Sequence, residues 1–354
     1  MKYFIVLVLI SINTEKVLSL DSTSMFKNIN FLVYNELYYN QNINDLNQNQ
    51  KPDFLYNHKF ENTFGINTLI GKISIKDTNY RGNFGLIFGS FSSYNMMEEP
   101  SWASFLYEAN VGFKISKKQN IWIDLGLMNS HLGFESAIGA DCWTVTRSIL
   151  AENSPYYETG AKISFTSKNE KWYIAAMYLN GWQNIAKITG KSNHSLGGQI
   201  TWKPSSNFTL NYSNFLGNAQ PDSNRNMRFY NNFYAIYEKK KWGFIAGFDL
   251  GVDKNVLKEQ GIWYAPVAIV RYQLNLKNTI ALRGEYYRDA QNIIIEIGKS
   301  KPVNLWAISS NFDFKFMKYF LWRNEIKYFF GNQELFNGQQ NNISFTSSFN
   351  IIFK

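Results

Sequence analysis

Near the end of the chain, apolar and charged residues alternate with a period of two. The apolar positions are Phe320, Trp322, Ile326 and Tyr328, and the charged positions among them are Arg323, Glu325 and Lys327. In a β-strand successive side chains point to opposite faces, so this stretch predicts one apolar face and one charged face. Unpaired charge is costly in a dry core, whereas the interior of a wide barrel can hold water. The pattern therefore argues against an ordinary packed core on the charged side.

The closing stretch, NNISFTSSFNIIFK at 341–354, alternates in the same way with small polar residues on its second face. Phe349 and most of its odd-numbered neighbours are apolar, and Ser348 and most of its even-numbered neighbours are polar. A soluble sandwich would pack the apolar face against a second sheet, and an outer-membrane barrel would turn that face to lipid.

Period-two runs of about ten residues recur along the whole chain. We predict about sixteen strands, near 28–41, 58–76, 80–92, 103–116, 119–129, 156–167, 171–183, 193–204, 206–217, 226–238, 241–252, 261–275, 278–289, 303–316, 318–331 and 341–353. The inward face of the first two runs is ambiguous. Pro266 predicts a bulge or an edge irregularity, because proline has no N–H to give to a ladder.

Short and long connections alternate between these runs. The short ones lie at 76–79, 116–118, 167–170, 204–206, 239–240, 276–277 and 317. An up-and-down barrel produces this alternation, with turns at the periplasmic rim and loops outside. An aromatic girdle at a membrane interface is predicted near the short turns from Tyr80, Trp172, Trp202, Trp242 and Tyr319. The expected fold is all-β, a closed up-and-down antiparallel transmembrane β-barrel of about 16 strands.

Residues 1–19 are typical of a secretory signal peptide, with one early Lys, an apolar core and a cleavage position near Ser19. This leaves 20–354 as one barrel domain. No later apolar run approaches the roughly 20 residues of a membrane-spanning helix. Cys142 is the one cysteine, so no intramolecular disulfide forms. The net charge of +9 suits an anionic surface, and the lack of a basic helix or binding motif argues against nucleic acid.

The charged positions of the alternating runs predict which residues line the interior. The lumen-lining candidates are Arg271, Arg283, Glu285, Asp313, Arg323, Glu325 and Lys327. Asp124, Lys162 and Asp249 extend this set on earlier runs. Because the two signs are mixed, no strong field of one sign results, and we expect weak ion selectivity.

The longest connection, loop 130–155, is the candidate constriction. Asp141 is placed to cap a short helix on which Cys142, Val145 and Ile149 share one side. A loop that folds into the lumen would narrow the pore. The candidates for a charged constriction are Glu135, Arg147, Glu152 and Glu158. The alternative is a loop that packs over the rim and is held there by Glu–Arg pairs.

Ser130, His131 and Glu135 are the set that most resembles a nucleophile, a base and a carboxylate. Adjacent residues of a strand point apart, so Ser130 and His131 do not form a triad hydrogen bond while the strand continues, and no G-x-S-x-G turn occurs. His58 and His194 lack Cys or carboxylate neighbours at zinc-site spacing. We therefore expect no catalysis, no metal site and no cofactor.

Several stretches resemble one family over nearly the whole mature chain. They are HLGFESAIGADCWTVTRSILAENSPYYETGAKISF (131–165), LNGWQ (179–183), YEANVGF (107–113) and PDSNRNMRFYNNFYAIY (221–237). These motifs are similar to those of the OmpL-like, porin-2 type β-barrel porin family of Bacteroidota-like Gram-negative bacteria. Cys142 departs from the pattern, since a polar residue such as Asn is expected there, and so does Lys354, which follows the final aromatic residue. The resemblance implies an outer-membrane barrel that passes small solutes.

The residues and the resemblance together predict a porin in the bacterial outer membrane, with a water-filled channel for passive diffusion of small hydrophilic solutes. The alternative is a barrel with a structural or ligand-specific role and no open pore, and a soluble exported sandwich is the third hypothesis. The expected partners are outer-membrane lipid and lipopolysaccharide, the barrel assembly machinery and small hydrophilic solutes, with no nucleic acid. Formation of a homo-oligomer is left open.

Overall fold

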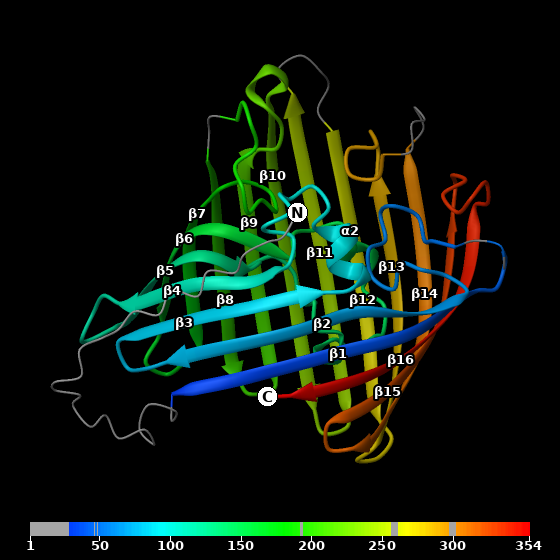
Figure 1. Cartoon of the computed structure of the whole chain (residues 1–354), viewed down its shortest axis with the longest axis horizontal. Coiled ribbons are helices and arrows are strands. Elements are labelled where there is room, and N and C mark those ends of the chain that lie inside the picture. Colours follow the sequence, from blue (N-terminus) through cyan, green and yellow to red (C-terminus); the bar gives the residue numbers. More distant parts are fainter. Residues whose placement is uncertain (1–27, 46, 48, 192–193, 256–260, 297–301) are drawn as a thin grey trace, which may run out of the picture.

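A computed structural model describes residues 28–45, 47, 49–191, 194–255, 261–296 and 302–354. Sixteen antiparallel strands form one closed barrel in which each strand pairs with its neighbours in sequence and β1 pairs with β16 (Figure 1). The strands are β1 Ile29–Asn42, β2 Thr63–Lys76, β3 Tyr80–Phe88, β4 Leu106–Lys114, β5 Asn120–Asn129, β6 Tyr157–Thr166, β7 Trp172–Leu179, β8 Ser195–Ser205, β9 Phe208–Asn218, β10 Asn226–Lys239, β11 Trp242–Asn255, β12 Gly261–Gln273, β13 Asn278–Asp289, β14 Val303–Met317, β15 Phe320–Gly331 and β16 Asn341–Phe353. The predicted closed barrel is confirmed, and the expected signal peptide at 1–19 lies outside the described residues.

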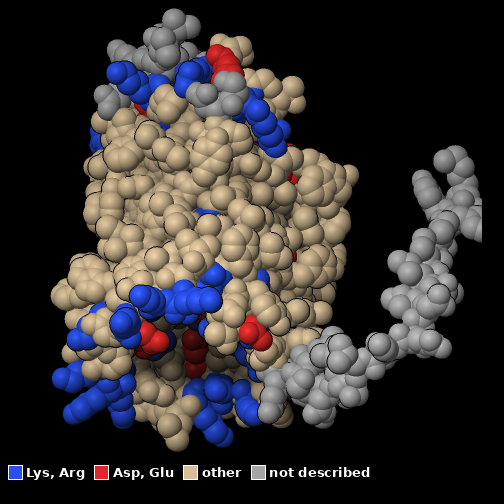
Figure 2. Space-filling model, turned by 90° about the vertical axis from the view of Figure 1, so that its left-hand side faces the viewer, with Lys and Arg blue, Asp and Glu red and all other residues tan. Residues whose placement is uncertain are grey.

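The two faces of each strand follow the alternation in the sequence. On β16 the Phe349 side chain is 50% exposed on the outside, whereas Ser348 beside it is fully buried inside. The same arrangement on the other strands gives the barrel an apolar outer band. Figure 2 shows this band as a tan belt between two rims, where the Lys, Arg, Asp and Glu side chains gather. An apolar band of this kind is the surface that a barrel presents to lipid.

The closing pair settles the face of the first strand, which the sequence left ambiguous. β1 pairs with β16 from Val33 opposite Phe353 to Asn42 opposite Ser344. Glu36 is fully buried inside, whereas Val33 is exposed on the outside. The register between β1 and β2 shifts just after Glu36, which is the irregularity that obscured the pattern of the second run.

Pairing of β12 with β13 is interrupted at Pro266, although the register is the same before and after it. The expected irregularity is therefore present without a bulge, because proline has no N–H to contribute to the ladder. Near the short turns, Tyr80, Trp172 and Trp242 are exposed on the outside, and the rings of Trp172 and Trp202 stack at 5.8 Å. These contacts are those of an aromatic girdle at one membrane interface.

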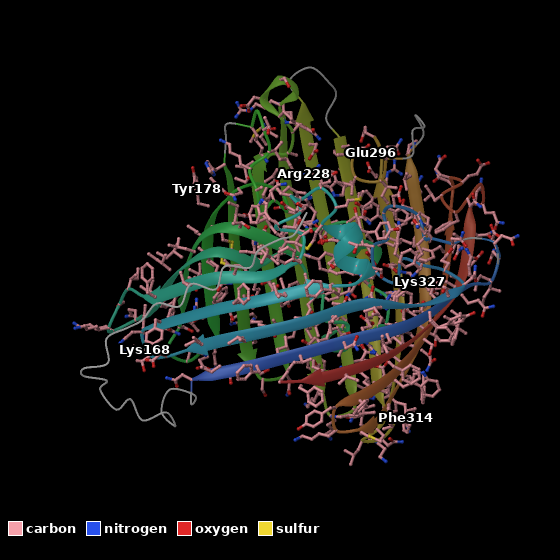
Figure 3. The ribbon with its side chains drawn as sticks, viewed as in Figure 1. Lys168, Tyr178, Arg228, Glu296, Phe314 and Lys327 are labelled. Carbon is pink, nitrogen blue, oxygen red and sulfur yellow. The ribbon has the colours of Figure 1, made fainter. Side chains whose placement is uncertain are left out.

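Helices are confined to the connections. They are α2 Ser90–Asn95, α3 Ile149–Glu152 and the 3-10 helices η1 Gly139–Asp141 and η2 Asp222–Asn224. No helix in the described part of the chain is both long and apolar enough to cross a membrane. The long connections leave one end of the barrel and the short turns close the other. Figure 3 shows Glu296 at the loop end, Phe314 at the short-turn end and Lys327 between them.

Candidate functional site

Loop 130–155, which joins β5 to β6, does not pack over the rim but enters the barrel. Its first residues are fixed to the wall formed by β6, β9 and β10. His131 Nδ1 lies 2.6 Å from Glu158 Oε2, and His131 Nε2 lies 2.7 Å from the carbonyl oxygen of Asn214. The hydroxyl of Ser213 donates to the His131 carbonyl at 2.8 Å. Gly197 makes room for the ring, since a Cβ at this position would lie 2.8 Å from His131 Cε1.

The middle of the loop is bound to the opposite wall through one fully buried arginine, Arg283 on β13. Its Nη1 donates at 2.8 Å both to the hydroxyl of Thr144 and to the carbonyl of Thr146, and its Nη2 donates to the hydroxyl of Thr146 at 2.9 Å. Charge-assisted hydrogen bonds of this kind are about twice as strong as neutral ones. Arg283 is therefore the main tether of the loop.

Buried carboxylates surround the same arginine. Arg283 lies 2.7 Å from Glu325 and 3.2 Å from Glu285, and Glu135 of the loop lies 4.0 Å away. Lys327 binds Glu285 at 2.7 Å and also donates to the carbonyl of Arg147. These ionic groups lie between the loop and the wall, where each is paired with a group of opposite sign.

The tip of the loop reaches down to the short-turn end. Arg323 on β15 is held by Asp313 at 2.9 and 3.0 Å, and it donates to the carbonyls of Gly139 and Cys142 at 2.7 and 3.0 Å. Lys354, the last residue, forms an ion pair with Asp141 at 2.6 Å. The loop therefore extends through the depth of the barrel.

The prediction of a short helix in this loop is confirmed, but its expected start after Asp141 was wrong for a physical reason. The N–H groups of Val145 and Thr146 donate to Asn311 and Glu325 of the wall, at 2.8 and 2.5 Å. The wall thus satisfies backbone groups that a helix would satisfy internally. The short helix begins later, at Ile149, where the Ser148 side chain caps it by accepting from the N–H of Ala151.

The four constriction candidates are all buried and paired. Arg147 donates to the carbonyls of Ser136, Ala137 and Val145 and so holds the loop to itself. The other three are Glu135, bound by Ser148, Glu152, which accepts from the N–H groups of Tyr56 and Asn57, and Glu158, held by His131. All four side chains therefore make contacts that hold the loop. They do not meet at one point to form a charged ring in the pore.

The inner face of β11 to β14 differs from the polar lining that the sequence suggested. Many buried side chains on it are apolar, and those from the strands include Ile245, Ala265, Val267, Ile269, Ala281, Val303, Leu305 and Ala307. They belong to one apolar cluster with Leu132, Ile149 and Leu150 of loop 130–155. These positions can be apolar because the inserted loop, not water, covers them, and they lie beside the buried ionic groups at Arg283.

Water-accessible space remains on the other side of the lumen, beside β5 to β10. A mid-barrel hollow of about 250 Å³ is lined by His131, Lys162 and Tyr173, among others. A rim hollow of about 570 Å³ toward the short turns is lined by Lys171 and Lys203, among others. The two hollows share lining residues, namely Tyr173, Gln199 and Tyr234. The two hollows are therefore neighbours on the same side of the lumen.

A third hollow of about 250 Å³, the outer vestibule, lies at the loop end. Tyr56, Glu152, Trp182 and Arg228 are among its lining residues. The Trp182 ring, whose centroid lies 5.1 Å from that of Phe215, belongs to the aromatic packing below the vestibule. The vestibule shares no lining residue with the mid-barrel hollow.

The seven lumen-lining candidates all lie on the inner face, but the hollows are not lined by them. Six of them, Arg283, Glu285, Asp313, Arg323, Glu325 and Lys327, belong to the ionic groups beside the loop. Arg271 pairs with Glu238 at 2.6 Å and stacks on Trp143 of the loop. The residues that do line the hollows include Tyr173, Gln199 and Tyr234, which we did not single out from the sequence. The period-two rule applied to β7, β8 and β10 would have placed them inside.

His131 links loop attachment to pH. Burial disfavours its protonation, but the Glu158 carboxylate and the Asn214 carbonyl outweigh burial and the nearby Lys162 charge, and together they raise the pKa of His131. A histidine whose pKa is raised by folding stabilises the folded protein fully when the pH is below its ordinary pKa of about 6.5. This stabilisation is lost as the pH rises through the pKa of the folded state. Protonated His131 therefore holds the start of the loop more tightly.

We expect current fluctuations through single channels to increase as the pH is raised above the ordinary histidine pKa of about 6.5 and through the raised pKa of His131, because His131 then loses its charge. In the His131→Gln variant this pH dependence should be absent, since glutamine keeps a polar side chain and has no titratable proton. An identical pH dependence of the noise in both proteins would contradict the role of His131.

The residues considered for catalysis have structural contacts. The Ser130 hydroxyl accepts from the N–H of Leu132, while the His131 ring is held by Glu158 and Asn214. Burial raises the pKa of the Cys142 thiol, which makes it a poor nucleophile. Within the described ranges, no three His, Cys, Asp or Glu side chains are grouped as metal ligands.

Comparison with known proteins identifies this architecture. Residues 28–354 match the family described as "Putative beta-barrel porin-2, OmpL-like". Among solved structures, the barrel is similar to OprB of Pseudomonas putida, with a TM-score of 0.62 and 9% identity over 94% of this chain and 96% of that one. It is also similar to the anion-selective porin from Comamonas acidovorans, with a TM-score of 0.60 and 6% identity over 92% and 99% of the two chains.

The trimer form of OmpT from Vibrio cholerae is similar as well, with a TM-score of 0.62 and 8% identity over 92% and 99% of the two chains. No curated protein matches the chain. At these identities the solved structures establish the fold, whereas the match to nearly the whole described chain establishes the family. The chain belongs to the porin-2, OmpL-like family and is a porin of the bacterial outer membrane, a diffusion channel and not an enzyme.

Proposed function

We propose that small hydrophilic solutes cross this barrel along the side formed by β5 to β10, past loop 130–155. The observation that carries this proposal is that the mid-barrel and rim hollows lie side by side and share the lining residues Tyr173, Gln199 and Tyr234. On the opposite side the loop and the wall are joined by hydrogen bonds from Arg283 and by apolar packing. Loop 130–155 thus narrows the lumen through the volume that it occupies. The side chains that fix its conformation are Glu135, Arg147, Glu152 and Glu158.

Weak ion selectivity is part of this proposal. Most charges on the inner face are paired, as Arg81 is with Asp124 at 2.5 Å and Arg228 is with Asp253 at 2.8 Å. Paired charges of opposite sign leave little net field along a pore. Under a salt gradient, the reversal potential should therefore lie far from the limit for a single permeant ion.

A cysteine on the proposed route tests it directly. In a Cys142→Ser background, Gln199→Cys places a thiol in both hollows, and a charged methanethiosulfonate reagent should then reduce the single-channel conductance. The matched control is Ile200→Cys, the next residue of β8, whose side chain is exposed on the lipid face. Equal sensitivity of the two variants, or none in either, would refute this route.

In the same recordings, conductance steps that occur in groups of three would indicate that the channel is a trimer.

We propose as partners the outer-membrane lipids and lipopolysaccharide around the apolar band, and the barrel assembly machinery, which reads the last strand. Self-association is a further proposal, supported by the likeness to OmpT, whose structure is described as a trimer form. The exposed outer rings, such as Phe349 and Trp306, suit contact with lipid or with a second barrel.

A further inference from the structure

The outer vestibule has a composition unlike that of the other two hollows. Four aromatic rings from four separate segments surround it, those of Tyr56, Tyr94, Tyr157 and Trp182. The mid-barrel and rim hollows contain mainly charged and small polar side chains with two tyrosines. A concave site with several aromatic rings and a few fixed polar groups is the usual form of a small-molecule binding site.

Two amide oxygens in the vestibule have no partner. Asn95, at the end of α2, is only 8% exposed, and its Oδ1 has no hydrogen-bond partner among the described residues. The Oδ1 of Asn184, in the connection after β7, likewise lacks a partner within the described ranges. A buried acceptor without a donor costs free energy, so both positions favour a ligand that brings donors.

The charged side chains that line the vestibule are Glu98, Glu152 and Arg228. The Glu152 carboxylate accepts from the N–H groups of Tyr56 and Asn57 at 2.8 to 3.3 Å. Arg228 is bound by Asp253 at 2.9 and 2.8 Å, and its guanidinium stacks 4.7 Å from the Trp182 ring. An anionic ligand would find no free cation at Arg228 and two carboxylates beside it, so the vestibule disfavours anions.

Aromatic rings, unpaired acceptors and the absence of a free cation at Arg228 together describe a ligand. A ligand that carries no negative charge, is rich in O–H donors and presents flat apolar faces to rings fits these features. Pyranose sugars have these properties, because their axial C–H groups form apolar faces and their hydroxyl groups radiate from the ring edge. We propose that the outer vestibule is a binding site for neutral sugars that enter the channel. This inference rests on the proposed diffusion route, because it names the solute class that this route admits.

The positions of the contributing segments support such a site. The lining residues come from the connections β1–β2, β3–β4, β5–β6, β7–β8 and β13–β14, together with the start of β6 and β10. The connections hold each other in place through Glu99, which accepts from the Tyr157 hydroxyl at 3.0 Å and from the N–H of Ile185 at 2.7 Å. Gln183 further bonds to the backbone of Asn95 and Tyr156. The site is therefore fixed before a ligand arrives.

The test uses maltotriose with the full-length folded protein in two assays. In planar bilayers, maltotriose added on the loop side should interrupt the ion current with a saturable concentration dependence. Polyethylene glycol of similar mass should reduce the current only in proportion to its concentration. In detergent micelles, saturation-transfer NMR should show magnetisation passing from the protein to the sugar C–H protons, which does not require conduction.

Tyr94→Ala should weaken maltotriose binding by about tenfold, the size of one lost aromatic contact. Asn184→Ala should weaken it to a similar extent, because the unpaired acceptor is lost. Tyr80→Ala, which removes an exposed ring from the outside of the barrel at the short-turn end, is the matched control and should leave sugar binding unchanged. Heat-modifiable migration on gels confirms that each variant is folded, since a closed barrel has no free strand edge.

The outcomes separate the two proposals. Conducting channels without saturable sugar binding in either assay would overturn the sugar site and leave the diffusion route standing. Sugar binding in the NMR assay without conductance would refute the diffusion route and support the site. Binding that Tyr94→Ala and Asn184→Ala leave unchanged would place the sugar outside the vestibule and overturn the proposal.

Discussion

Replacing Arg283 by alanine should release loop 130–155 and increase the single-channel conductance severalfold. The change removes three hydrogen bonds to Thr144 and Thr146 of the loop. It also leaves the buried carboxylates of Glu285 and Glu325 without their common cation. Breaking a buried ion pair by removing one partner typically costs about 3–5 kcal/mol. The barrel ladder does not depend on Arg283, so the loss falls on the seating of the loop.

Planar-bilayer recordings measure the change in conductance, and limited proteolysis measures exposure of the loop. Arg271→Ala is the matched control, because Arg271 is also an inward arginine near a loop residue but is only partly buried and pairs with the exposed Glu238. Its effect should be small. If Arg283→Ala retains wild-type conductance and protease resistance, the tether assigned to Arg283 is wrong.

The second large effect is expected on the outside of the barrel. Ile200 is the central residue of β8 and its side chain is 44% exposed on the lipid face. Arginine at the bilayer midplane of a barrel costs about 2–4 kcal/mol, so Ile200→Arg should lower the free energy of unfolding by that amount. Gln199→Arg places the same charge in the hollows, where water is accessible, and should change stability by only about 0.5 kcal/mol.

Urea unfolding in lipid vesicles, followed by tryptophan fluorescence, gives both free energies. The two substitutions are adjacent in sequence and introduce the same side chain, so their difference reports only the face of the strand. Equal destabilisation by the two would mean that β8 does not separate lipid from a wet lumen. The barrel would then lack the route proposed here.

The strands could be predicted because their information is local. A strand that separates lipid from a wet or loop-filled interior must alternate at every second residue, and this holds for β16 as much as for β13. The predicted ranges 278–289 and 341–353 coincide with these two strands. Where a bulge breaks the period, as after Glu36, the same rule gave an ambiguous face.

The path of loop 130–155 could not be predicted, because its partners are far away in sequence. Thr146 binds Glu325, 179 residues later, and Gly139 binds Arg323, 184 residues later. From the sequence, Glu325 and Arg323 were candidates for wet pore charges, since alternation shows which face a side chain occupies but not what covers that face. The unpaired amides of Asn95 and Asn184 were not recognisable for the same reason.

The distance between loop 130–155 and its partners along the chain also orders events during biogenesis. The loop is synthesised before β13 to β15, which supply Arg283, Arg323 and Lys327, and before Lys354, which follows β16. Until these strands are inserted and β16 has joined β1, the loop has no wall to bind on that side. An incomplete barrel would therefore hold an unseated loop beside an open seam. Narrowing of the channel is thus a late step of maturation, which follows the pairing of β16 with β1.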